Sequence, residues 1–225
     1  MALLLAIETT TKNCSVALFE NSNLLECKEQ NSNDYSHAEC LTFFIEEVVR
    51  KLDITLKEID GIILSKGPGS YTGLRIGTST AKGLCYSLDI PLISISTLKA
   101  MAYGMSKKED YKFYCPMIDA RRMEVFSSIF DQSNNEVREI RADIVDEYTY
   151  AQFLQEKVLF FGDGASKCKT IIDNANAYFM DGVFPSAKDM GVLGSERFAN
   201  SYFEDVAYFE PYYLKDFVAG LKKKF

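Results

Sequence analysis

The sequence predicts an α/β protein built from two lobes, each containing a mixed sheet flanked by helices. Three short strands joined by polar turns open the chain, and such strands form an antiparallel meander. Helices and strands then alternate, and strands linked by crossover helices run parallel to a neighbour. The expected strands are 3–8, 14–19, 24–29, 60–65 and 91–96. The expected helices are 36–52, 72–88 and 97–105.

The opening pattern recurs in the second half of the chain. An apolar run ends in an acid at Glu8 and again at Asp119, and Phe19 and Phe130 end the strands that follow. The same spacing of 111 residues separates both pairs. This common offset predicts a duplicated unit and two lobes around a cleft. We expect an N-terminal lobe at 1–106 and a C-terminal lobe at 107–225, joined by a polar stretch.

Composition narrows the class of protein. The 225 residues are 47% hydrophobic and carry 25 basic and 32 acidic groups, for a net charge of −7. An acidic chain is a poor candidate for binding nucleic acid alone, because Lys and Arg supply most of that affinity. No run of ~20 apolar residues could span a membrane. The six cysteines show no Cys-x-x-Cys spacing and no signal peptide is recognised, so we expect a cytoplasmic protein with reduced thiols.

The single histidine, His37, limits the catalytic chemistry. A zinc site with two histidines is excluded, and a Ser-His-Asp triad could use only this residue. We therefore expect no metal.

The most distinctive local feature is the Gly/Pro loop 65–75, Ser-Lys-Gly-Pro-Gly-Ser-Tyr-Thr-Gly-Leu-Arg. It joins an expected strand to an expected helix, and Ser70 or Thr72 could cap that helix. It matches neither common nucleotide fingerprint. Two interpretations stay open, an anion site at the helix N-terminus and a structural turn.

This segment resembles a known family. Residues 67–77 and the Ala-Lys-Gly-Leu at 81–84 closely resemble the smaller, non-catalytic subunit of bacterial tRNA threonylcarbamoyladenosine synthesis. Further matches are Leu5-Ala6-Ile7-Glu8-Thr9, Ile95-Ser96-Thr97-Leu98, Ile118-Asp119-Ala120-Arg121 and Glu210-Pro211-Tyr212-Tyr213-Leu214. The resemblance implies the duplicated fold of actin, the 70-kDa heat-shock chaperone and the sugar kinases, which agrees with the repeat.

The resemblance also implies a function. It implies an accessory subunit that scaffolds a larger catalytic paralogue, which transfers threonylcarbamoyl to N6 of adenosine 37 in tRNAs reading codons that begin with A. A small ATPase subunit joins the pair, and tRNA is contacted only through the complex. We therefore expect this chain to have no catalytic residues and to bind no cofactor. Self-pairing of the free chain is left open.

Two other functions are weighed against this one. The larger paralogue holds its metal with His-x-x-x-His, whereas this chain has Leu41 after His37, which disfavours the peptidase that an old family label suggests. Actin-like ATPases and sugar kinases place Asp and Gly in the first hairpin, where this chain has Glu8-Thr9-Thr10. Glu8 and Asp119, with Gly67 and Gly69, are expected to line at most a vestigial cleft; alternatively, each acid caps its own turn.

A partner surface is predicted on two helices. The face of helix 72–88 opposite its apolar stripe carries no charge, although a solvated face usually does. Phe43 falls on the polar face of helix 36–52. The expected interface residues are Phe43, Ile76, Ser79, Thr80, Gly83 and Ser87. The alternative is a helix buried on both sides within its own fold.

Overall fold

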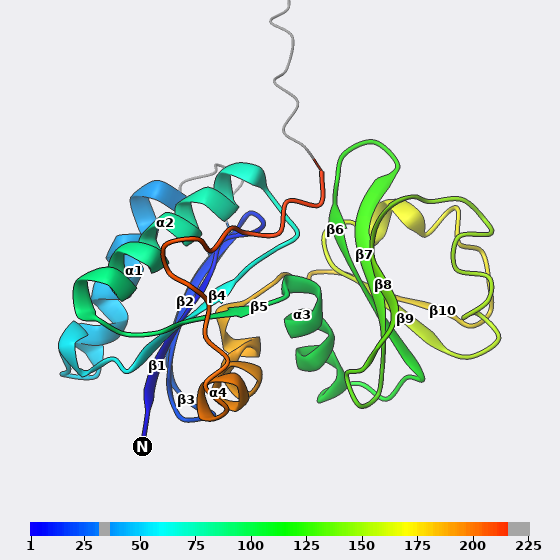
Figure 1. Ribbon diagram of the computed structural model, residues 1–225. Helices are drawn as coiled ribbons and strands as arrows, with labels where there is room; N and C mark the ends of the chain where they lie inside the picture. The colour runs from blue at the N-terminus through cyan, green and yellow to red at the C-terminus, as the bar shows by residue number, and fades with distance from the viewer. Residues whose placement is uncertain (32–36, 216–225) are drawn as a thin grey trace, which may run out of the picture.

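A computed structural model describes residues 1–31 and 37–215. Two five-stranded mixed sheets lie side by side (Figure 1). The first has the order β3-β2-β1-β4-β5, from β1 Leu3–Glu8, β2 Asn13–Glu20, β3 Asn23–Asn31, β4 Gly61–Ser65 and β5 Leu92–Ile95. The second has the order β10-β9-β6-β7-β8, from β6 Phe113–Asp119, β7 Glu124–Asp131, β8 Glu136–Ile144, β9 Val158–Phe161 and β10 Ala177–Met180.

The two sheets repeat one topology. In each, the first strand pairs antiparallel with the second and parallel with the fourth. β7 begins and ends 111 residues after β2, which is the offset read from the sequence. The predicted duplicated α/β fold with two mixed sheets is therefore confirmed.

Helices cover both faces of the first sheet. The helices of the described ranges are α1 His37–Lys51, α2 Tyr71–Leu88, α3 Thr97–Ser106 and α4 Gly191–Ala199, with short 3-10 turns η1 Leu56–Glu58, η2 Ser166–Cys168 and η3 Ala187–Asp189. Figure 1 shows α1 and α2 together on one side and α4 on the other. The oxygen of Ser70 accepts from the Gly73 amide at 3.3 Å and starts α2. Ser36, where the helix expected at 36–52 begins, and the side chain of His37 lie outside the described residues.

Each face of the first sheet has its own apolar core. Alternate residues of the strands point to opposite faces. Leu5, Ile7 and Ile62 pack beneath α1 and α2, whereas Leu4, Ala6 and Ile63 pack against the layer that contains η3 and α4. The sheet is thus buried on both faces, which explains its nearly continuous apolar strands.

The chain returns to the first lobe after β10. The side-chain Nδ2 of Asn13 donates to the Pro185 carbonyl at 2.9 Å, Glu204 forms a β-bridge with Leu92, and the Tyr212 backbone amide donates to the Lys66 carbonyl at 2.7 Å. The boundary expected near residue 106 lies where α3 ends and the second sheet begins. We propose that the first lobe comprises 1–106 together with 184–215, rather than an uninterrupted C-terminal lobe from 107.

No helix within 1–31 or 37–215 is long and apolar enough to cross a membrane.

Candidate functional site

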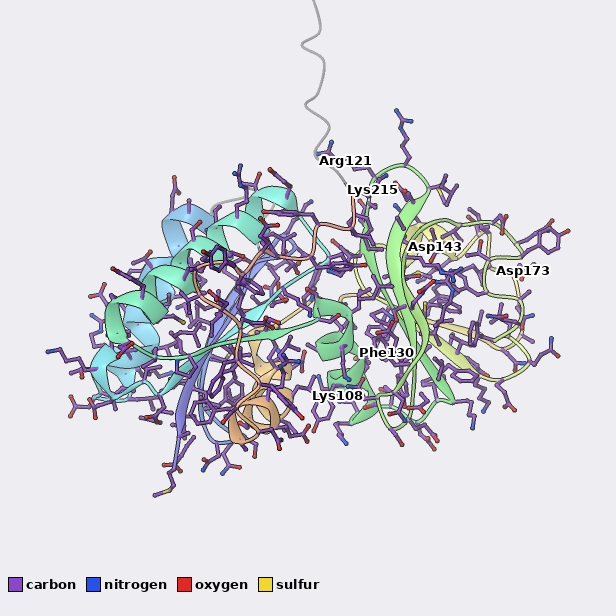
Figure 2. The ribbon with its side chains drawn as sticks, viewed as in Figure 1. Lys108, Arg121, Phe130, Asp143, Asp173 and Lys215 are labelled. Atoms are coloured by element: carbon purple, nitrogen blue, oxygen red, sulfur yellow. The ribbon has the colours of Figure 1, made fainter. Side chains whose placement is uncertain are left out.

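A cleft of about 460 Å³ opens between the two lobes. The first lobe contributes the β1–β2 turn and the start of α2, and the second contributes the end of β6 and its turn. The return segment closes one side through Tyr213 and Lys215. The Tyr213 ring lies 5.0 Å from that of Tyr71, and Lys215 forms an ion pair with Glu124 of β7. Figure 2 shows Arg121 and Lys215 at the same edge of the molecule.

Glu8, at the end of β1, is turned into the first lobe. Its side chain is 1% exposed and accepts hydrogen bonds from the Thr10 amide at 2.5 Å and from the side chain of Ser65. Burial raises the pKa of Glu8 above its usual range, although these hydrogen bonds oppose the shift. Glu8 is not among the residues that line the cleft.

Asp119, the equivalent acid of the second lobe, does line the cleft. Its carboxylate pairs with Lys167 and accepts from the Arg121 amide at 3.0 Å. An ammonium group therefore already compensates its charge. Glu8 and Asp119 thus occupy equivalent positions in different environments, and only Asp119 lines the cleft.

The two predicted glycines have different positions. Gly69 lines the cleft and packs on the β1–β2 turn, where a Cβ would lie 2.4 Å from the Thr10 carbonyl oxygen. The next amide, of Ser70, donates to that same oxygen at 2.7 Å. Gly67 does not line the cleft, and its carbonyl accepts from the Thr97 amide at 3.1 Å. The Gly/Pro loop therefore covers the first turn with its own backbone.

This packing does not suit the metal-bridged phosphate that actin-like ATPases bind. Glu8 is buried and does not line the cleft, and the loop carrying Gly69 is hydrogen-bonded directly to the turn that a phosphate would approach. A vestigial role for the four predicted cleft residues stays a prediction.

Asp163 belongs to the cleft, whereas the sequence permitted two interpretations of its segment, a worn phosphate loop and a plain turn. It follows β9, and its Oδ1 accepts from the Asp119 amide at 3.0 Å. Burial raises the pKa of Asp163, and Lys12 lies near enough to oppose the shift. The Gly-Asp-Gly at 162–164 was the sequence signal available.

The outer face of α1 and α2 is the second candidate surface. The exposed predicted residues are Phe43, which is 55% exposed, and Ser79, Gly83 and Ser87. Nothing lies within 4 Å of a Cβ built on Gly83. Thr80 is half-buried. Phe43, Ser79, Gly83 and Ser87 therefore present an uncharged surface to solvent.

Ile76 departs from the expectation of a free outer position. It is half-buried and packs against the core beneath α2. Helical spacing placed Ile76 on the outer side and could not show the neighbouring apolar side chains that half-bury it. Tyr86 was missed and is 87% exposed on the same helix. The signal available in the sequence was an aromatic residue next to Ser87.

Comparison with known proteins places the chain in a family. A family model described as TsaD, tRNA N6-adenosine threonylcarbamoyltransferase, matches residues 31–222. The tRNA threonylcarbamoyladenosine biosynthesis protein TsaB of Buchnera aphidicola from Acyrthosiphon pisum is 30% identical, over 69% of each chain. The chain belongs to this family, among its TsaB members. The TsaB protein of Escherichia coli K12 is 29% identical over 97% of each chain.

The fold also matches that of a solved structure. YeaZ from Pseudomonas aeruginosa superposes with a TM-score of 0.80 at 23% identity, covering 95% of this chain and 100% of that one. The likeness extends to both lobes and the return segment, so the architecture derived from the strand pairing is that of a known protein.

Proposed function

We propose that this chain is a non-catalytic subunit of the cytoplasmic complex that installs threonylcarbamoyl on N6 of adenosine 37 in tRNA. Its relatives are named as biosynthesis proteins of this modified nucleoside. The family model that covers most of the chain is named for the transferase itself. A chain related to the transferase in sequence is suited to pair with it.

The observation that carries the non-catalytic role is the orientation of Glu8. A general base or metal ligand must reach the reacting groups, whereas Glu8 is buried and hydrogen-bonded within its own lobe. We expect no turnover of ATP and no cleavage of peptides by the isolated chain. ATP turnover that disappears in Glu8→Gln would contradict this expectation.

The proposed partner surface is the outer face of α1 and α2. It combines an exposed aromatic, Phe43, with small uncharged residues that allow close helix approach, such as Ser79 and Gly83. A larger paralogue with equivalent helices would dock there, and the small ATPase subunit would join the pair. tRNA would be held through the complex, consistent with the net charge of −7. The free chain could use the same face to pair with itself.

A reconstitution tests the role. The larger transferase and the small ATPase subunit are incubated with tRNA, threonine, bicarbonate, ATP and the enzyme that forms the threonylcarbamoyl donor. We expect the modified nucleoside, measured by mass spectrometry after nuclease digestion, only when this chain is added. Glu8→Gln should support the same rate, because Glu8 touches no substrate in this proposal. Full modification without the chain would overturn the accessory role.

A further inference from the structure

A second groove lies on the first lobe, away from both surfaces described above. It has a volume of about 360 Å³ and is formed where β4 and β5 end, between α3 and α4. The carboxyl ends of parallel strands are where open α/β sheets commonly bind ligands. Its walls include Ile95 and Leu193, which belong to the α4 side of the sheet. The groove therefore lies on the face opposite α1 and α2.

Three cationic side chains from three separate segments line this groove. They are Lys66 after β4, Lys99 in the first turn of α3, and Arg197 in the last turn of α4. Glu196 is the acid among the lining residues. A local excess of positive charge is unusual in a chain with 25 basic and 32 acidic groups.

The cations are only partly neutralised. Lys66 and Lys99 are half-buried, and within the described ranges neither ammonium group forms an ion pair. Arg197 reaches Glu204 at 3.4 Å, a long contact, and Glu204 also accepts from the Ser94 hydroxyl at 2.5 Å. The Nε of Arg197 is buried and meets no acceptor in the part of the chain that is described. Buried donors without an acceptor are rare in native proteins.

The backbone fixes these groups in place. The Lys66 amide donates to the Ile95 carbonyl at 2.9 Å, and the Lys66 carbonyl accepts from the Tyr212 amide. Ser96 caps α3 by accepting from the Lys99 amide at 3.4 Å, so the positive end of that helix dipole also faces this region. The groove thus presents positive charge from a preformed frame.

An aromatic ring stands at the rim. Tyr202 lines the groove, is 63% exposed, and is held by its amide, which donates to the Arg197 carbonyl at 2.9 Å. Exposed aromatic rings beside cations are the usual platform for stacking nucleic-acid bases.

We propose that this groove binds the phosphate of a nucleotide, with Tyr202 stacking on the base. The nucleotide can be free or part of an RNA strand, because both offer the same phosphate and base. Lys66, Lys99 and the exposed part of the Arg197 guanidinium contact the phosphate oxygens. The proposal does not depend on the partner role, since the groove lies on the opposite face of the sheet.

Calorimetric titration of the full chain tests the site. The probes are AMP, adenosine, inorganic phosphate and a short single-stranded oligoadenylate RNA, each at low and at physiological ionic strength. We expect AMP or the oligonucleotide to bind at one site, adenosine to bind at least tenfold more weakly, and affinity to fall with salt. Binding of the oligonucleotide but not of AMP would support the site with RNA as the source.

Variants assign the binding to the groove. Lys99→Gln and Lys66→Gln, both of which leave the core intact, should each weaken binding about tenfold. Tyr202→Ala should weaken AMP or RNA binding several-fold and leave phosphate binding unchanged. Lys57→Gln, an exposed lysine of η1 outside the groove, is the matched control and should bind like the wild type.

Three results would overturn the proposal. One is the absence of saturable binding by every phosphate-bearing probe. Another is adenosine binding as tightly as the best phosphate-bearing probe, and the third is unchanged affinity in both lysine variants. None of these results bears on the reconstituted modification reaction, so the two proposals fail separately.

Discussion

The two lobes share one strand order but differ in what covers their sheets. In the first lobe, long helices α1 and α2 pack over the sheet through an extensive apolar cluster. In the second, turns and η2 cover the equivalent face, and a buried ion pair joins Arg138 and Asp143 at 2.6 Å. Duplication has kept the backbone topology while each copy has acquired a different layer. The partner surface that we propose therefore lies on the first copy.

The same contrast holds for the equivalent acids at the strand ends. Glu8 is buried in its lobe, whereas Asp119 is exposed to the cleft and paired with Lys167. An equivalent position in a repeat thus does not imply an equivalent chemical role. The surroundings of each acid, set by residues distant in sequence, decide its charge and its access.

The largest effect should come from breaking the ion pair of the second lobe. Arg138→Met leaves Asp143 buried and uncompensated, which should lower the free energy of unfolding by about 3–5 kcal/mol. Arg141→Met is the control, because Arg141 pairs with Glu139 in an exposed position, and should cost less than ~1 kcal/mol. Urea denaturation of both variants measures this difference. Equal losses would show that the buried pair does not stabilise the second lobe.

The pH dependence of that pair has a definite sign. Burial works to raise the pKa of Asp143, but hydrogen bonds from Arg138 and Ser127 hold it below its usual range. When folding lowers the pKa of a carboxyl group, the resulting stabilisation is complete at pH values above the pKa of the unfolded state. It is lost as the pH falls through the pKa of the folded state. The destabilisation caused by Asp143→Asn should therefore be greater at pH 7 than at pH 3. Unfolding free energies at both pH values measure it, and an equal loss would contradict it.

Asp189 of η3, in the first lobe, should show the opposite dependence. Burial raises the pKa of Asp189 to about 6, although the positive charges of the nearby Lys108 and Lys188 act to lower it. The folded state then binds the proton more tightly, so stability falls as pH rises from the unfolded pKa through 6. The stability of Asp189→Asn relative to wild type should rise by up to about 3 kcal/mol between pH 4 and pH 8. Unfolding at both pH values measures it, and a constant difference would contradict it.

Substitutions at two glycines distinguish the effect of close packing from that of helix propensity. Gly69→Ala places a methyl group against the Thr10 carbonyl and should cost about 1–3 kcal/mol. Gly83→Ala meets nothing within 4 Å and should gain about 0.5–1 kcal/mol, because alanine favours a helix. Thermal denaturation of the two variants should shift in opposite directions. A gain for Gly69→Ala would show that the loop is not packed on the first turn.

Much of the fold follows from local sequence patterns. Alternating apolar residues and the 111-residue offset predicted β1, β2 and β6, because strand period and polar turns are local features. The return of 184–215 to the first sheet was not predicted, since contacts such as Tyr212 with Lys66 join distant segments. The same limitation hid the groove, whose three cations are separated in sequence and meet only after folding.

The central claim is that the partner docks on the outer face of α2 in the first lobe. Gly83→Glu places a charge in open space on that face, and glutamate favours a helix over glycine, so the free chain should fold normally. Ala199→Glu, exposed at the end of α4 on the opposite side, is the control. Titration against the purified larger transferase should show at least about a hundredfold weaker affinity for Gly83→Glu, because a desolvated unpaired charge costs several kcal/mol. Wild-type affinity in Gly83→Glu, or an equal loss in Ala199→Glu, would contradict docking on this face.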